Sequence, residues 1–478
     1  MIAGSGSALA ASGWTTAVRS QPGFRVPRVI VTARDANVAP GFIFLTPRTI
    51  YPGRTGPTIL DKDGHVVWFH RQSYRLSAQN LRPQIYRGQP VLTWSLSPPL
   101  LREGEALTRG ATPRNTYNVI ADQSYRTIKR VRAVGRGVIT NGHDFVITRK
   151  NTALVLGSRL VPRRLKRYGG PASGRIVDDL VQEIDIRTGR VLFSWSSAAH
   201  IPLSESMVRF PKTGYWDPFH LNSVSADSDG GLLVSARHTS TVYKISRHTG
   251  HIVWKLGGRH SSFRMGPGAS FYYQHDAERQ ADGTITLFDN GATLDDLSHG
   301  RDSQAKRLRL DKRRKTATLV TRFKHPSGRG LASSQGNASV LANGDVFVGW
   351  GISPWFSEYA ADGRLLFGAR FSSVWHHSYR AYKAPWSARP LTKPAVYARV
   401  TSGHVAAYVS WNGATDVANW RLLGGADQNS LSASGTAPWA NFETKLAFEG
   451  TPAFVQVQGL DANGAVLGAS AVVKTQRG

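Results

Sequence analysis

The chain has 478 residues, which is too long for one ordinary domain unless the fold is built from repeats. Its 48 glycines, 24 prolines and 13 tryptophans favour short strands joined by turns, and 60 Lys and Arg against 31 Asp and Glu give a formal net charge of +29. The absence of cysteine excludes disulfides, iron–sulfur sites, thiolate zinc sites and a cysteine nucleophile.

The positive charges are spread along the chain, which is typical of a solvated basic surface, although such a field also attracts anionic substrates or a polyanionic envelope. We expect no nucleic-acid partner, since the sequence lacks an RNP-type aromatic motif, zinc-finger spacing and a recognition helix. No stretch approaches about 20 apolar residues, so we expect no transmembrane segment. The start MIAGSGSALAASGWTTA lacks a basic end and a long apolar run, and it is not a convincing signal peptide.

The chain divides into three predicted parts. Residues 1–38 form a polar N-terminal leader with one strand near residues 28–32, residues 39–390 form the main domain, and residues 391–478 form a C-terminal domain. In the main domain a hairpin recurs six times, about 60 residues apart on average. These hairpins are expected at residues 56–69, 117–131, 181–195, 242–254, 305–323 and 356–367.

An inner hairpin precedes each of these hairpins except the first, so a repeat contains four strands. Four strands per unit at a roughly regular period predict an all-β fold, namely a six-bladed β-propeller. Ser378–Tyr382 is expected to complete the first blade and close the ring, which removes exposed sheet edges.

The C-terminal part follows a proline-containing linker, Pro385–Pro394. Alternating strands from about residue 395 to residue 474 predict an immunoglobulin- or fibronectin-like β-sandwich. No residue there stands out for chemistry, and Trp411 and Trp420 are expected in its core.

Polar residues recur at the start of the inner strands of successive blades. His143 stands in NGHDF, His220 and Asn222 stand in FHLN, His275 stands in QHDA, and Asn337 stands in QGNA. Equivalent positions of a propeller surround its central channel, so three histidines from consecutive blades are expected at one mouth. Only 15 residues of the chain are His, so three matched placements favour a functional site over three separate structural histidines.

Arg237 ends the next strand, and the hairpin brings it back beside His220 and Asn222. Three histidines would suit a metal such as zinc, but a guanidinium repels a dication unless Asp144 or Asp276 offsets its charge. Recognition of a tetrahedral oxyanion fits better, because Arg offers a planar fork of donors and His and Asn offer further donors. One histidine could act as a nucleophile, since imidazole forms covalent intermediates.

At these residues the sequence resembles the arylsulfate sulfotransferases, which are nucleotide-independent enzymes built on a six-bladed β-propeller. The resemblance covers about residues 38–390 and rests on motifs in the right order: FHLNSV, SARHTS, KISRHTGHIVWKLGG, QHDA, LFDNG, SQGNASVLANGDVFVGWG and SYRAYKAPW. The chain is most similar to the actinobacterial and fungal branch, whose members often carry a C-terminal sandwich.

The resemblance implies a role for each candidate residue. His275 matches the nucleophile that becomes sulfurylated, and His220 and Asn222 match the paired acid/base and sulfate-binding positions. Arg237 matches the sulfate-binding arginine, and His143 matches a further active-site histidine. The implied catalytic residues are therefore His275, His220, His143 and Arg237. The implied substrate-binding residues are Asn222, Arg237, His143 and Asn337, although the family's hydroxyl-bearing residue near Ser334–Asn337 is left unassigned.

The resemblance further implies ping-pong transfer of a sulfuryl group from an aryl sulfate to a phenol through a sulfohistidine, with no cofactor and no metal. It implies a secreted or cell-surface protein. A different interpretation is a non-catalytic propeller that holds an anionic glycan or a protein partner at the same mouth, because a fold does not fix a function. A metal-dependent hydrolase is the third interpretation.

Overall fold

The computed structural model describes residues 13, 15–48, 55–73, 75–98, 114–211, 214–292 and 301–477. In these ranges the regular structure is almost entirely strand, which confirms the all-β prediction. The helical elements among them are short: α1 (Ser197–His200), η2 (Lys166–Tyr168), η3 (Leu203–Glu205) and η4 (Arg237–Thr239). No helix in the described ranges is long and apolar enough to cross a membrane.

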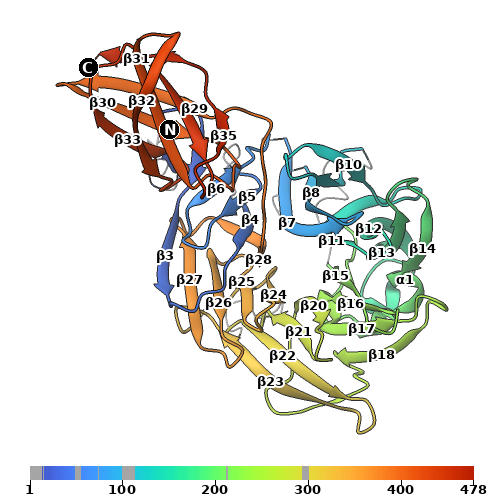
Figure 1. Ribbon diagram of the computed structural model, residues 1–478. Coiled ribbons are helices and arrows are strands. Elements are labelled where there is room, and N and C mark those ends of the chain that lie inside the picture. The colour runs from blue at the N-terminus through green and yellow to red at the C-terminus, as the bar shows by residue number, and fades with distance from the viewer. Residues whose placement is uncertain are drawn as a thin grey trace, which may run out of the picture.

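Six sheets formed by the described residues follow one another around a ring (Figure 1). The first consists of β28 (His377–Ala384), β4 (Phe42–Arg48), β5 (Thr58–Leu60) and β6 (Val66–Phe69). The second consists of β7 (Ser77–Tyr86), β8 (Gln89–Ser97), β9 (Tyr117–Ala121) and β10 (Thr127–Val131). The third consists of β11 (Ile139–Ile147), β12 (Thr152–Arg163), β13 (Gly174–Asp185) and β14 (Val191–Ser196).

The remaining three sheets have the same antiparallel order of four strands, and two of them gain an outer strand. The fourth consists of β15 (Leu221–Ala226), β16 (Leu232–Ala236), β17 (Thr241–Ile245) and β18 (Ile252–Gly257). The fifth consists of β20 (His275–Arg279), β21 (Ile285–Asp289), β22 (Gln304–Asp311) and β23 (Thr316–Lys324), with β19 (Arg264–Met265) outside them. The sixth consists of β24 (Asn337–Val340), β25 (Val346–Gly349), β26 (Trp355–Tyr359) and β27 (Leu365–Phe371), with β3 (Val29–Arg34) outside them.

The ring is closed by a strand from its C-terminal end. β28 pairs antiparallel with β4, so the expected pairing of residues 378–382 with the first hairpin is confirmed. The first strands β7, β11, β15, β20, β24 and β28 contact one another in that order, and β28 contacts β7. The strand expected near residues 28–32 is β3, and it joins β27 at the outer edge of the sixth sheet.

Apolar side chains between neighbouring sheets form the core. Leu232 and Val234 of β16 pack with residues of the third sheet, whereas Leu233, between them in sequence, packs with residues of the fifth sheet. This division follows from the two-residue period of a strand, which sends alternate side chains to opposite faces. A strand with apolar residues on both faces therefore joins two sheets.

The first strands of five of these sheets contain a bulge within the described residues. The register with the second strand shifts after Gln79, Asn141, Leu221, His275 and Ser378. Asn80 and Asp276, inside two of the bulges, have positive φ of 62° and 53°. A bulge leaves a residue outside the ladder and redirects its side chain. The bulges thus explain how polar residues of the first strands leave the apolar alternation of the sheets.

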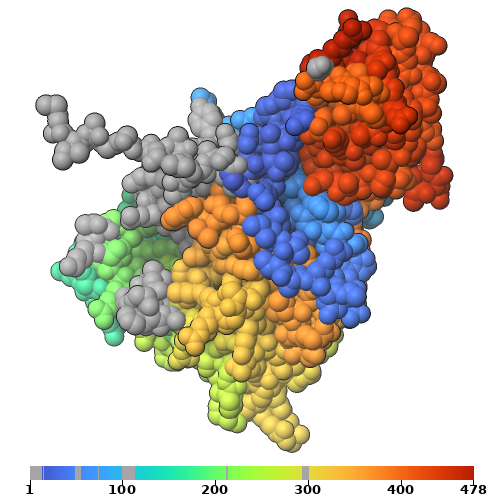
Figure 2. Space-filling view, turned by 90° about the vertical axis from the view of Figure 1, so that its left-hand side faces the viewer, coloured from blue at the N-terminus to red at the C-terminus, as the bar shows by residue number. Residues whose placement is uncertain are grey.

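Two further sheets lie beyond the ring (Figure 2). One consists of β33 (Thr444–Glu449), β30 (His404–Ser410), β29 (Ala395–Thr401) and β37 (Gln476–Arg477). The other consists of β32 (Ser430–Pro438), β31 (Asn419–Asp427), β34 (Phe454–Leu460) and β35 (Val466–Ala469), and β36 (Val473–Lys474) pairs with β34. Trp411 and Trp420 are buried in the apolar cluster of these strands, as predicted. The short strands β1 (Thr15–Ala17) and β2 (Arg25–Pro27) form a separate pair.

Candidate functional site

The main candidate residues lie in the first strands or directly beside them. His143 lies inside the bulge of β11, His220 directly precedes β15, and His275 is the first residue of β20. Arg237 begins η4 directly after β16, and its backbone N–H donates to the carbonyl oxygen of His220 at 2.9 Å. The hairpin of β15 and β16 therefore sets the arginine next to the histidine.

Three histidine rings form a continuous cluster. The ring centroids of His143 and His220 are 4.9 Å apart, and those of His220 and His238 are 4.6 Å apart. His220 and His238 are buried, whereas His143 is half-buried. The cluster thus joins the third and fourth sheets, and it includes one histidine that was not among the predicted residues.

Asp217 lies behind two of these histidines. Its Oδ2 accepts a hydrogen bond from Nδ1 of His220 at 2.5 Å and lies 3.9 Å from Nδ1 of His238. Burial raises the pKa of the Asp217 carboxyl, but the charge and hydrogen bond of His220, followed by His238 and His143, lower it to about 2. Asp217 therefore remains a carboxylate at neutral pH and favours a proton on Nδ1 of His220. Nε2 of His220 is then the nitrogen that can exchange a proton with a substrate.

His238 connects Asp217 to Arg237. Its Nδ1 donates to the carbonyl oxygen of Asp217 at 2.7 Å, and its Nε2 accepts from Nη1 of Arg237 at 2.9 Å. A guanidinium only donates hydrogen bonds, so this pair requires a neutral imidazole with a lone pair on Nε2. Burial lowers the pKa of His238 to about 3, which agrees with a neutral ring.

Arg237 contacts three groups among the described residues. Besides the bond to His238, its Nη2 donates to the carbonyl oxygen of Ser333 at 3.2 Å, and its guanidinium carbon lies 4.8 Å from the centre of the Tyr273 ring. These partners fix the direction of the guanidinium. An arginine fixed in this way is suited to bind an oxyanion.

His275 is completely buried between the fifth and sixth sheets. Its Nδ1 lies 2.7 Å from Oδ1 of Asn290 and 3.2 Å from the carbonyl oxygen of Tyr273. On the other side of the ring, the backbone N–H of Gln335 donates to Nε2 at 3.2 Å. Nε2 accepts a hydrogen bond and Nδ1 faces two acceptor oxygens, so the ring proton lies on Nδ1.

Tyr379 of β28 connects His275 to the other histidines. Its ring centroid lies 5.5 Å from that of His143 and 6.4 Å from that of His275. The structure therefore brings His143, His220 and Arg237 together directly, and it brings His275 to them through the Tyr379 ring and the segment around Ser333. Candidate residues from the third, fourth and fifth sheets thus share one region.

Two predicted substrate-binding residues use their amides to join neighbouring sheets. Nδ2 of Asn222 donates to the carbonyl oxygen of Gln274 at 2.7 Å. Asn337 donates from Nδ2 to the carbonyl oxygen of Ala381 at 2.7 Å and accepts from the N–H of Ala381 at 2.8 Å. Both asparagine side chains are fully buried. This geometry favours a role in holding the first strands together, and their contact with a substrate stays a prediction.

A buried charge network lies next to the cluster. Nη1 of Arg380 in β28 lies 3.1 Å from Oδ1 of Asp144 and 2.9 Å from Oδ1 of Asp276, and Nη2 donates to the carbonyl oxygen of Asn222 at 2.9 Å. Burial raises the pKa of the Asp276 carboxyl to about 7, although Arg380 opposes this shift. One arginine thus connects the first, third, fourth and fifth sheets.

Two groups in the described residues have the ligand spacing of a metal site: Asp217, His220 and His238 in one, and Asp61, Asp63 and His65 in the other. In the first group, both ring nitrogens of His238 and Nδ1 of His220 are engaged in hydrogen bonds, and Arg237 lies directly beside them. In the second, Oδ1 of Asp61 accepts two backbone N–H groups of its own turn. Hydrogen bonding accounts for both groups without an ion.

Replacing His238 by Gln is expected to weaken the dependence of stability on pH. The folded protein keeps His238 neutral down to about pH 3, whereas the unfolded chain takes up the proton near pH 6.5. The unfolded state therefore binds more protons between pH 6.5 and pH 3, so the free energy of unfolding decreases as the pH falls through this range. Denaturant unfolding at several pH values should give a shallower slope for His238→Gln than for the wild type. The exposed His248→Gln should keep the wild-type slope, and an equal slope for both variants would contradict the assignment.

The sequence did not reveal three residues that form hydrogen bonds to the predicted site residues. Asp217, His238 and Asn290 contact His220, Arg237 and His275, respectively. His238 and Asn290 stand in the motifs SARHTS and LFDNG, and Asp217 stands three residues before His220. Their positions beside predicted residues were a signal that could have found them, because polar residues next to catalytic groups often orient them.

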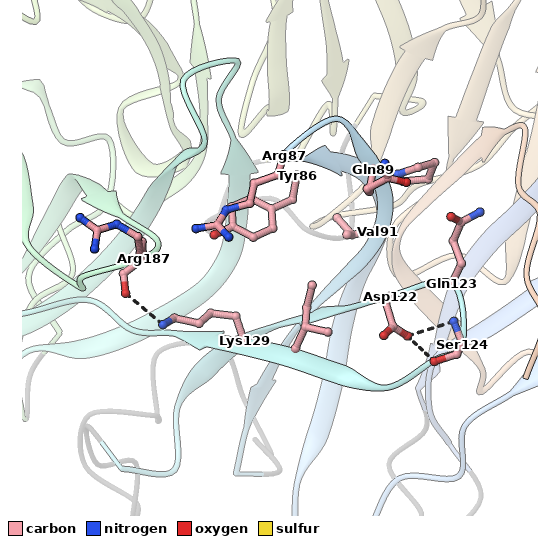
Figure 3. Close-up of a pocket in the computed structure, with 11 residues that line it drawn as sticks. Tyr86, Arg87, Gln89, Val91, Asp122, Gln123, Ser124, Lys129 and Arg187 are labelled. Atoms are coloured by element: carbon pink, nitrogen blue, oxygen red, sulfur yellow. Dashed lines mark hydrogen bonds between the residues drawn. The ribbon is translucent and has the colours of Figure 1, made fainter. Parts of the chain in front are cut away.

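A separate hollow of about 580 Å³ lies over turns of the second and third sheets (Figure 3). Arg87, Lys129 and Arg187 supply positive charge there, and Nζ of Lys129 donates to the carbonyl oxygen of Arg187 at 3.2 Å. None of the predicted site residues lines this hollow. The histidine cluster and the hollow are therefore distinct features of the molecule.

Comparison with known sequences identifies one family. The family described as arylsulfotransferase (ASST) matches residues 110–372, more than half of the chain. The matched range contains His143, Asp217, His220, Asn222, Arg237, His238, His275, Asn290 and Asn337. No curated protein matches the chain.

Solved structures show only distant similarity. A protein of unknown function from Bacteroides caccae is 12% identical, with a TM-score of 0.43, and the alignment covers 72% of this chain and 99% of that one. A catalytically inactive virginiamycin B lyase from Staphylococcus aureus with quinupristin is 8% identical, with a TM-score of 0.35 and coverage of 81% and 97%. A protein from Lactobacillus plantarum is 12% identical, with a TM-score of 0.32 and coverage of 86% and 100%.

Proposed function

Because the chain belongs to the arylsulfotransferase (ASST) family, we propose that it transfers a sulfuryl group from a phenolic sulfate ester to a phenol. The observation that supports this best is the cluster of Arg237 with His220 and His143, within reach of the buried His275 through Tyr379. A fixed cation and several imidazoles in one region suit an oxyanion whose charge moves during transfer.

In the first half-reaction, Nε2 of His275 attacks sulfur while Arg237 and the neighbouring histidines hold the sulfuryl oxygens. The Nε2–S bond forms, the bond from sulfur to the aryl oxygen breaks, and its electron pair remains on the phenolate. His220, supported by Asp217, gives a proton to the phenolate oxygen. In the second half-reaction another phenol attacks sulfur, returns its proton to His220 and leaves Nε2 with its lone pair. This ping-pong sequence passes through a sulfohistidine and needs no cofactor.

Access to His275 requires a local movement. Its Nε2 is occupied by the N–H of Gln335, and the side chain is fully buried. The preceding Ser333 accepts a hydrogen bond from Arg237, so residues 333–335 contact both the nucleophile and the anion-binding arginine. A shift of this segment would uncover Nε2 and release one guanidinium N–H at the same time, which couples anion binding to exposure of the nucleophile.

We further propose that the chain consists of a β-propeller followed by a β-sandwich. The strand order and the closed succession of first strands support six blades of a β-propeller over about residues 39–390. The shared apolar cluster of the last two sheets supports an immunoglobulin- or fibronectin-like sandwich over residues 391–478. Secretion or a cell-surface location rests on the family resemblance alone.

Incubation of the purified protein with 4-nitrophenyl sulfate and a phenol tests the proposed activity. We expect release of 4-nitrophenol and, without an acceptor, a gain of one SO3 group in the mass of the intact protein. A chelator should not change the rate. Binding of the aryl sulfate without release or mass gain would instead identify a non-catalytic anion-binding protein and would overturn the proposal.

A further inference from the structure

We infer that Asn290 is a positioning residue that fixes the tautomer of His275, so that the proton stays on Nδ1 and Nε2 carries the lone pair. Asn290 is the residue directly after β21, next to His275 on the adjoining strand β20. This inference rests on the proposed function, because it explains how His275 could serve as the nucleophile. No catalytic contact is required of Asn290 itself.

The orientation of the Asn290 amide is determined by its other partners. Nδ2 donates to the carbonyl oxygen of Ala332 at 2.6 Å and to that of Gln335 at 3.0 Å. An inverted amide would set Oδ1 against both carbonyl oxygens, which can only accept. Oδ1 must therefore face the ring of His275, where it lies 2.7 Å from Nδ1.

The amide in turn determines the state of the imidazole. An oxygen acceptor at Nδ1 requires an N–H there, so Nε2 of a neutral His275 carries the lone pair. The Gln335 N–H, which donates to Nε2, agrees with this arrangement. Asn290, His275 and Ala332 are fully or almost fully buried, so water does not compete for these bonds.

His275 and His220 have different hydrogen-bond partners at Nδ1. Nδ1 of His220 meets the carboxylate of Asp217, which stabilises a positively charged ring and suits a proton donor. Nδ1 of His275 meets a neutral amide, which fixes the tautomer without favouring protonation. The partner at Nδ1 thus makes His220 suited to donate a proton and His275 suited to attack sulfur.

The decisive variant is Asn290→Asp, measured by the pH dependence of kcat for 4-nitrophenyl sulfate. One carboxylate oxygen behind His275 would favour the imidazolium, so we expect the acidic limb to move to higher pH by about 1–3 units. Activity lost at neutral pH should therefore return at alkaline pH. The other carboxylate oxygen loses the hydrogen bonds to Ala332 and Gln335, so the melting temperature should fall in addition. In Asn290→Ala, kcat should fall by about a hundredfold or more, with little change in KM, because the tautomer is no longer fixed. Asn463→Asp, which adds the same charge on an exposed turn, should keep the wild-type profile.

A pH-independent loss of activity in Asn290→Asp would show a merely structural role and would overturn the inference. If the variants do not fold, the wild-type protein still provides a test. A crystal structure of the sulfurylated wild type should show sulfur on Nε2 and Asn290 bonded to Nδ1, and sulfur on Nδ1 would contradict the inference. Absence of nitrophenol release and of mass gain in the wild type would instead reject the proposed function.

Discussion

Replacement of His275 by Ala is expected to abolish turnover of 4-nitrophenyl sulfate, with a fall in rate of about 10³-fold or more. The reason is that His275 is proposed to form the bond to sulfur, so its loss removes the intermediate rather than one stabilising contact. Arg237, His220 and His143 remain in place and should still hold the donor. The variant should therefore bind the aryl sulfate but gain no SO3 group when its intact mass is measured.

The exposed His251→Ala is the matched control and should retain wild-type turnover and mass gain. A melting temperature near that of the wild type would show that His275→Ala is folded. Wild-type release of nitrophenol by folded His275→Ala would refute the assignment of the nucleophile. A mass gain in that variant would direct attention to another histidine of the cluster.

Replacement of Arg380 by Met should lower the free energy of unfolding by about 3–5 kcal/mol, because loss of one partner leaves uncompensated charge in the interior. Arg380 is fully buried and faces both Asp144 and Asp276. Methionine fills much of the same space but offers no positive charge. The measurement is chemical denaturation at neutral pH.

The loss of stability in Arg380→Met should depend on pH. Burial already raises the pKa of Asp276 to about 7, and loss of the guanidinium removes a charge that opposes this shift, so protonation of Asp276 should make the loss of stability smaller at mildly acidic pH than at neutral pH. Arg364→Met is the control, since Arg364 forms a similar pair with Asp35 at 2.9 Å but is largely exposed. Its effect should be much smaller. If both variants lose the same free energy of unfolding, burial does not increase the contribution of Arg380 to stability.

The repeated hairpins were predictable because their signals are local. Turns with Asp and Gly, such as Asp227–Gly230, separate strands of alternating apolar residues, and a two-residue period is visible without any tertiary contact. The return of β28 to β4 followed from the need to complete a repeat. The polar residues at strand starts also stood out against the apolar pattern, which is why His143, His220 and His275 could be named.

The bulges and the supporting contacts were not predictable in the same way. A bulge alters the direction of a side chain without altering the apolar pattern, so nothing indicated that the Asn222 amide would bond to a neighbouring strand. Asn337 lies in the regular strand β24, and its bonds to Ala381 depend on how β24 packs against β28. The contact of Asp217 with His220 depends on how the chain enters β15, and that of Asn290 with His275 depends on the pairing of β20 with β21. Such contacts are set by tertiary packing.

The closing strand also constrains the order in which this protein can mature during synthesis. β28 is the last part of the ring to leave the ribosome, and it carries both Tyr379 and Arg380. Until it docks, β4 presents an open edge, and Asp144 and Asp276 lack their contact with Arg380. A nascent chain therefore has every histidine of the cluster long before the ring around the cluster is complete, and premature termination ahead of residue 377 would leave an open-edged, aggregation-prone product.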